Sequence, residues 1–137
     1  MIWVWLGIAI TLGGTTADSV WHLTYGFPAE QGIPYPHYIV MTGIVMSLAS
    51  CVSMLRLTEG RKRLWWFGAV MIALELSGSL WDNLVYHSRG IYGAPLQEIP
   101  HTMEGIGGIL WLLTALVISV NRMIQRTHER TRGTRSS

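Results

Sequence analysis

The chain has little of what soluble folds and their metal motifs usually depend on. It has one cysteine among 137 residues, Cys51, which lies inside an apolar run. A single thiol excludes an internal disulfide and a cysteine-rich metal motif, so we expect it to be buried and inert. Charged residues make up 13% of the chain, about half the share of a typical soluble domain. An ordinary soluble domain is therefore excluded.

The net charge is also small, at a formal value of +2. It comes largely from a basic C-terminal tail, so it is a signal of membrane topology and gives no nucleic-acid-binding surface. Half of the residues are hydrophobic, and there are seven tryptophans and fifteen glycines. Indole rings favour the bilayer interface, and glycine is frequent in membrane helices. The composition is typical of an integral membrane protein.

Four segments are long and apolar enough for helices that cross a bilayer, which takes about 20 residues each. They are residues 2–25, 37–57, 64–87 and 101–123. The short connections make neighbouring segments antiparallel. We therefore expect an all-α fold, a bundle of four transmembrane helices within residues 1–125, with the first segment retained as a span and not removed as a signal peptide.

Lysine and arginine set the expected orientation, because they concentrate on the cytoplasmic side. Basic residues lie between the second and third segments and after the fourth, and only Arg89 lies on the other side. We expect a multi-pass protein of the cell (inner) membrane with both termini in the cytoplasm. The connections 26–36 and 88–100 then face outward, and residues 126–137 form a basic, disordered tail that touches lipid.

The sequence repeats itself with a shift of 64 to 65 residues. Residues 1–57 align with residues 64–123, so that Trp21-His22 falls on Tyr86-His87 and Pro36-His37 falls on Pro100-His101. Each copy holds two segments, so both copies point the same way, as in parallel membrane repeats. We predict a duplicated helical hairpin.

Each copy carries three groups that can bind a metal. Asp18 precedes His22 by four residues, and Asn83, on which Asp18 falls, precedes His87 by four, so each pair lies on one helix face. A proline then opens the next helix and places a histidine in its first turn. One carboxylate with two imidazoles suits non-heme iron, and imidazole also suits copper and zinc. The predicted metal ligands are Asp18, His22, His37, Asn83, His87 and His101.

Further acids accompany these groups. Glu104 lies one turn after His101, and Asp82 adjoins Asn83 but points about 100° away on a regular helix. We assign both as candidate catalytic acids that move protons. Glu75 lies deeper, near the bilayer midplane, where a charge costs about 2.5–3.5 kcal/mol. It is either a proton-path residue or a neutral carboxyl bonded to another helix.

At these positions the sequence resembles the C subunit of the copper membrane monooxygenases, the particulate methane and ammonia monooxygenase family. That family carries Asp-x3-His and Asn-x3-His, each followed by a distant histidine, and the six predicted ligands match this pattern over about 40 of the 137 residues. The resemblance implies copper, partner membrane subunits and oxidation of a small, weakly polar substrate. The chain is shorter than family members, which favours a reduced C-like or accessory subunit.

Two other functions remain open. Intramembrane acids are functional candidates by default, and Asp18, Glu75, Asp82 and Glu104 can instead line a proton, ion or metal transport path. Alternatively, the polar side chains only join helices by hydrogen bonds in a non-catalytic assembly subunit. In every case we expect the lipid bilayer and either other membrane subunits or a second copy of the chain as partners.

Overall fold

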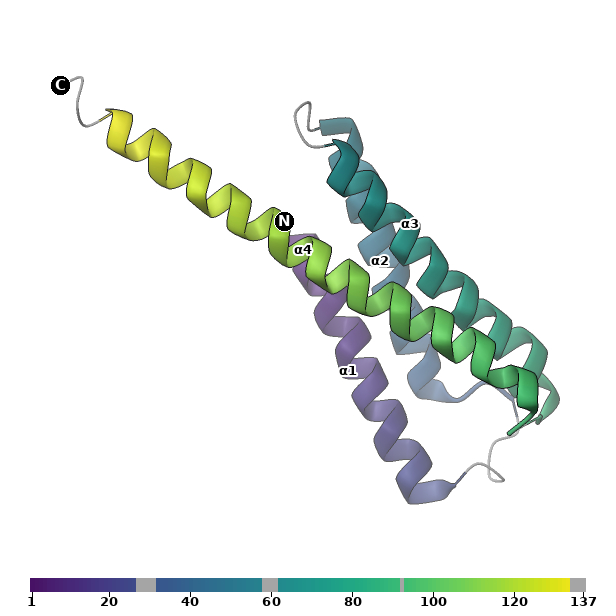
Figure 1. Cartoon of the computed structure of the whole chain (residues 1–137). Helices are drawn as coiled ribbons and strands as arrows, with labels where there is room; N and C mark the ends of the chain where they lie inside the picture. Colours follow the sequence, from purple (N-terminus) through teal and green to yellow (C-terminus); the bar gives the residue numbers. More distant parts are fainter. Residues whose placement is uncertain (27–31, 58–61, 92, 134–137) are drawn as a thin grey trace.

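The protein is all-helical, as predicted. The computed structural model describes residues 1–26, 32–57, 62–91 and 93–133, and in this part it has four α-helices (Figure 1). Their bounds are α1 Ile2–Tyr25, α2 Tyr35–Leu57, α3 Lys62–Trp81 and α4 Glu98–Gly133. After α3 the chain continues as a π-helical segment, Asp82–Tyr86, and then as two 3₁₀ turns, His87–Arg89 and Pro95–Gln97.

Three helical stretches are long and apolar enough to cross a membrane: Tyr35–Leu57, Lys62–Arg89 and Pro95–Glu129. α1 has sufficient length, at 24 residues, but its second half is rich in hydroxyl groups. Thr15, Thr16 and Ser19 donate to the carbonyl oxygens four residues earlier, at 2.8–3.0 Å. These bonds satisfy the hydroxyls inside the helix, so α1 stays regular.

The helices form two closely packed pairs, α1 with α2 and α3 with α4. Glycines lie at both contacts. A Cβ atom at Gly14 would lie 2.7 Å from the Val40 backbone nitrogen, and one at Gly107 would lie 2.7 Å from the Glu75 backbone nitrogen. Membrane helices commonly approach each other through such small residues. A duplicated hairpin would pair the first helix with the second and the third with the fourth, as observed. The duplication itself stays a prediction.

The apolar core joins the two pairs. Ile44, Trp65, Ile72 and Ile118 are almost fully buried there. Cys51 is buried among them, as expected, and its thiol donates to the Trp65 carbonyl oxygen at 3.1 Å.

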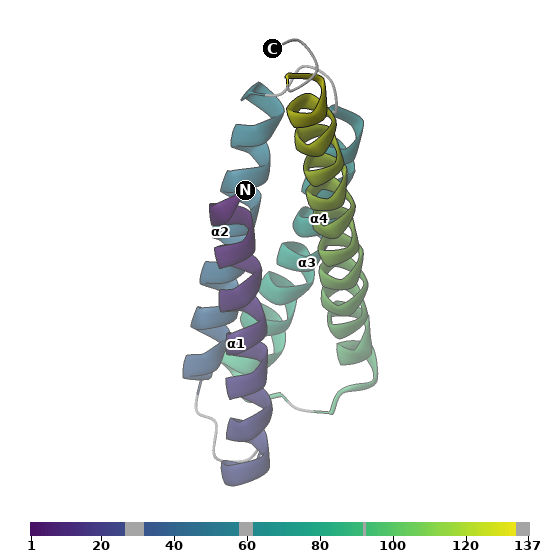
Figure 2. The ribbon, with the colours of Figure 1, turned by 90° about the vertical axis from the view of Figure 1, so that its left-hand side faces the viewer.

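The ends of the helices sort into two groups (Figure 2). The start of α1, the end of α2, the start of α3 and the end of α4 lie toward one end of the bundle, and the opposite termini lie toward the other. α4 continues well beyond the other helices to Gly133 (Figure 1). The prediction of a disordered tail from residue 126 is therefore wrong as far as Gly133, because extending a formed helix costs little. Residues 134–137 lie outside the described residues.

Candidate metal centre

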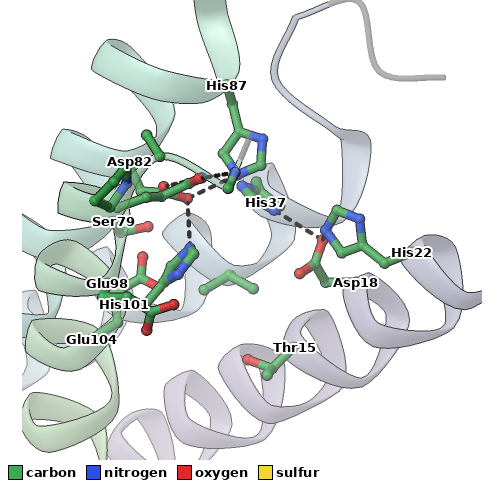
Figure 3. A pocket seen from close by; sticks show the side chains of 15 residues that line it. Thr15, Asp18, His22, His37, Ser79, Asp82, His87, Glu98, His101 and Glu104 are labelled. Atoms are coloured by element: carbon green, nitrogen blue, oxygen red, sulfur yellow. Dashed lines mark hydrogen bonds and ion pairs between the residues drawn. The ribbon is translucent and has the colours of Figure 1, made fainter. Parts of the chain in front are cut away.

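Four histidines and two aspartates gather around one cavity of about 670 Å³, where the C-terminal end of α1 meets the start of α2 and the segment that follows α3 (Figure 3). The cavity lies at the end of the bundle opposite the N-terminus. Its polar lining residues are Thr15, Asp18, His22, His37, Ser79, Asp82, His87, Gln97, Glu98, His101 and Glu104.

The first group comes from the first helix pair. Asp18 and His22 lie one turn apart on α1, and Pro36 opens α2 so that His37 lies in its first turn. Asp18 Oδ1 lies 2.9 Å from His37 Nε2 and 3.4 Å from His22 Nε2. The three donor atoms lie within 4.8 Å of one another. The structure thus brings together the three side chains that the sequence singled out in the first copy.

The second group differs from the expectation. Asp82 Oδ2 lies 2.8 Å from His87 Nε2 and 3.3 Å from His101 Nε2, so this carboxylate holds the place predicted for Asn83. Asn83 Oδ1 instead accepts a hydrogen bond from His37 Nδ1 at 2.7 Å, and Asn83 Nδ2 donates to the Ser79 carbonyl oxygen at 2.7 Å. The structure thus pairs Asp82, and not Asn83, with these two imidazoles, while metal binding by Asn83 stays a prediction.

The π-helical segment explains this exchange. The backbone N–H of His87 points at the carbonyl oxygens of both Asn83 and Asp82. In a regular α-helix residues i and i+4 share a face, whereas the wider π turn brings i and i+5 together. Asp82 and His87 are five apart. The prediction assumed an α-helical period throughout, so it paired His87 with the wrong neighbour.

A signal of this exchange was present in the sequence. A shift of 64 aligns Asp18 with Asp82 and also His37 with His101, whereas His22 reaches His87 only with a shift of 65. One extra residue therefore lies between Asp82 and His87. A single-turn π-bulge accommodates an extra residue without changing the helix on either side.

The two groups adjoin at His37. Its ring centroid lies 4.6 Å from that of His87, and the donor atoms of His37, Asp82 and His87 also lie within 4.8 Å of one another. His22 is close as well, with its ring centroid 6.4 Å from that of His87. Ions held by the two groups would therefore be immediate neighbours in one cavity.

Hydrogen bonds fix the orientation of the buried carboxylate. Gln97 Nε2 donates to Asp82 Oδ1 at 3.1 Å, and Gln97 Oε1 accepts from the Gly93 N–H at 2.8 Å. Asp82 is 1% exposed and His87 is 3% exposed, and a buried charge requires such partners. Sequence analysis missed Gln97, because nothing in the sequence places this connecting segment over α3.

The tautomer of His37 follows from Asn83. Since Asn83 Nδ2 bonds to a carbonyl oxygen, which only accepts, its Oδ1 must face His37 Nδ1, and that nitrogen carries the proton. His37 Nε2 then faces Asp18 Oδ1 at 2.9 Å. In a neutral ring, the lone pair of His37 Nε2 would face a lone pair of the Asp18 carboxylate oxygen. Nε2 therefore carries a second proton or shares a cation with Asp18.

Of the acids predicted to move protons, Asp82 belongs to a donor group, and Glu104 and Glu75, within the described part of the chain, do not. Glu104 lines the cavity on α4 close to His101 (Figure 3) but belongs to neither donor group among the described residues. Asp82, predicted to move protons, lies between two imidazoles, a position that suits a ligand. Glu75 is buried on α3 and lines a second, deeper cavity. Proton transfer by any of the three stays a prediction.

Comparisons with known proteins give this chain no relative. No protein-family model, no curated protein and no solved structure matches it. The resemblance to the copper monooxygenase C subunit thus depends on the spacing of a few residues, one of which, Asn83, is hydrogen-bonded to His37.

Proposed function

We propose that this chain is a multi-pass protein of the cell (inner) membrane that binds transition-metal ions at the His/Asp cavity. In this proposal all four helices span the bilayer, both termini are cytoplasmic and the cavity faces outward. The observation that carries it is two donor groups that share His37, Asp18/His22/His37 and His37/Asp82/His87, around one cavity, with His101 Nε2 3.3 Å from Asp82 Oδ2.

The donor separations support this function. Two ligand atoms about 2.1 Å from one ion are about 3.0 Å apart at a right angle and about 3.4 Å apart at a tetrahedral angle. The four separations between carboxylate oxygen and imidazole nitrogen lie between 2.8 and 3.4 Å. Small side-chain adjustments therefore suffice for an ion to replace the protons between these atoms.

The chemistry of the donor atoms limits which metal ions fit the site. Among the described residues, the cavity lining includes no thiolate or thioether, the ligands that select copper(I). Imidazole with carboxylate suits copper(II), iron(II) and zinc. We place copper first because of the resemblance, with iron and zinc as alternatives. Bound copper or iron would supply redox chemistry with dioxygen.

The protein residues would position and tune that metal. Gln97 holds one oxygen of Asp82 so that the other faces the two imidazoles, and Asn83 holds His37 with Nε2 toward Asp18. Such supporting bonds to metal ligands commonly change metal affinity by about 10- to 100-fold. Glu104 lies close enough to the cavity to exchange protons with a substrate there.

A complex with other membrane subunits completes the proposal. The chain would act as a C-like or accessory subunit of a membrane oxidase or monooxygenase whose substrate is small and weakly polar. The long exposed apolar faces of the helices support contact with lipid or with such subunits. Native mass spectrometry from membranes tests this part, and a chain that is always monomeric would contradict it.

Metal analysis of the purified full-length chain tests the central part. We expect one to two copper ions per chain after loading and dialysis, and a clear loss in His37→Ala, because His37 belongs to both donor groups. His128→Ala is the matched control, since this histidine lies on the exposed end of α4. Less than about a tenth of an ion per wild-type chain would contradict metal binding.

A proton relay is the second candidate, because Glu104 lines both cavities and Glu75 lines the deeper one. This candidate predicts that Glu75→Gln abolishes proton flux in proteoliposomes while copper loading is retained. Unchanged flux in that variant would exclude Glu75 from a relay.

A further inference from the structure

A second cavity of about 370 Å³ adjoins the metal cavity and reaches deeper into the bundle. Its wall is formed mainly by α1 and α4, with parts of α2 and α3. The two cavities share four lining residues, Thr15, Val40, His101 and Glu104. A molecule in the deeper cavity would therefore touch the wall of the metal centre.

The deeper cavity opens sideways, between helices that do not pair closely. α1 packs mainly against α2, and α4 packs mainly against α3, so the wall between α1 and α4 is loose. Two of its lining residues, Leu12 on α1 and Ile109 on α4, are 55% and 62% exposed. With both helices in a bilayer, these side chains face acyl chains. A lipid-soluble molecule thus reaches the cavity without crossing water.

The inner wall carries a buried acid. Glu75 is 7% exposed, and its Oε1 lies 3.0 Å from the place a Cβ atom would take on Gly108, which also lines the cavity. Among the described residues, the structure shows no hydrogen bond or ion pair of the Glu75 carboxyl. A buried carboxyl without a donor is costly.

We propose that the deeper cavity binds a neutral, lipid-soluble hydroxyl compound, whose apolar body enters between α1 and α4 and whose O–H donates to Glu75 or Glu104. The apolar wall favours the body, and the carboxyls favour a donor. An ammonium compound is a poorer fit, because its charge would itself have to leave water. The inference rests on the proposed function for its link to the metal centre, but binding is measured without metal.

A pair of photoprobes tests the proposal. The full-length chain in lipid nanodiscs is irradiated with an octanol that carries a diazirine, or with the matching diazirine octane, and the adducts are mapped by mass spectrometry. We expect the alcohol to label cavity residues such as Leu12, Ile109 and Leu112 about tenfold more than the hydrocarbon does. Excess unlabelled octanol should suppress this labelling.

Two glycine variants distinguish labelling inside the cavity from labelling of the lipid-exposed surface in general. A Cβ atom at Gly105 meets nothing within 4 Å, and Gly105 lines the cavity, so Gly105→Leu fills the space without a backbone clash. Gly13→Leu on α1 is the matched control, since its Cβ is equally unobstructed and Gly13 does not line the cavity. We expect labelling to be lost in the first and kept in the second. Glu75→Leu should remove the preference for the alcohol over the hydrocarbon.

Three outcomes would overturn the proposal: labelling of Gly105→Leu equal to wild type, loss of labelling in both glycine variants, or adducts spread over all lipid-facing helices without competition. Copper loading measured on the same samples keeps the two hypotheses separate. If octanol suppresses the labelling in a chain that binds no copper, the result supports the binding cavity and contradicts the metal site. If the chain binds copper but octanol does not suppress the labelling, the result supports the metal site and contradicts the binding cavity.

Discussion

Asp82 and Asn83 are neighbours in the chain, but their side chains have different partners. The Asp82 carboxylate lies between His87 and His101, whereas the Asn83 amide faces His37. Loss of a carboxylate that binds the metal should lower the number of bound ions, whereas loss of an amide that only orients a ligand should lower the affinity. The distinction can therefore be measured one residue at a time.

Asp82→Ala should lower the number of bound ions by one per chain, or weaken the binding of that ion beyond detection, because imidazoles without the carboxylate bind it poorly. Asn83→Leu should leave the number of ions unchanged and lower the affinity by about 10- to 100-fold, because His37 loses only the partner that orients it. Isothermal titration with copper measures both, and Asn121→Leu on α4 is the control. A greater loss in Asn83→Leu than in Asp82→Ala would restore the ligand set predicted from the sequence.

Acidification should release the metal, because imidazole must lose its proton to bind an ion, and binding therefore releases protons. Four histidines line the cavity, so retention should fall steeply between neutral pH and about pH 5. Equilibrium dialysis across this range gives the number of protons exchanged per ion. Retention that does not change with pH would argue against imidazole ligands.

Among the elements, the regular helices follow from local periodicity, whereas the irregular segment is marked only by the one-residue difference between the two repeat shifts. α1 follows an α-helical period to Tyr25, so the spacing of Asp18 and His22 gave the correct pair. The π-helical segment Asp82–Tyr86 has no composition that distinguishes it from an α-helix. Gln97 comes from a connection whose path depends on tertiary packing. The prediction was accurate where local periodicity decides position and failed where the position depends on packing.

A pair of deletions tests the π-bulge. Without Leu84, a residue that is 58% exposed, Asp82 and His87 become four apart, and a regular helix still aligns them. Copper binding should then change by no more than about threefold. Without Leu80, on the α-helical side, Asp82 turns by about 100° relative to α3, and copper binding should be lost. Equal losses in both deletions would show that the π turn does not act as a one-residue insertion.

At the scale of the whole molecule, the site depends on how two closely packed helix pairs meet. Glycine contacts bring α1 to α2 and α3 to α4, and His37 of the first pair completes the donor group of Asp82 and His87. The four segments and their antiparallel order could be predicted from hydropathy and loop length. The shared cavity could not, because the spacing within each pair carries no information on the distance between the pairs.

The orientation of the bundle is the remaining prediction at this scale, and the chain's single cysteine makes it measurable. Cys51 is fully buried, so an introduced thiol reports against a low background. Leu96→Cys, at a position 62% exposed beside the metal cavity, should react with a membrane-impermeant maleimide in intact cells. Thr127→Cys, on the exposed end of α4, should react only after the cells are opened, since the positive-inside rule places that end in the cytoplasm. Labelling in the reverse order would invert the topology and place the metal cavity on the cytoplasmic side.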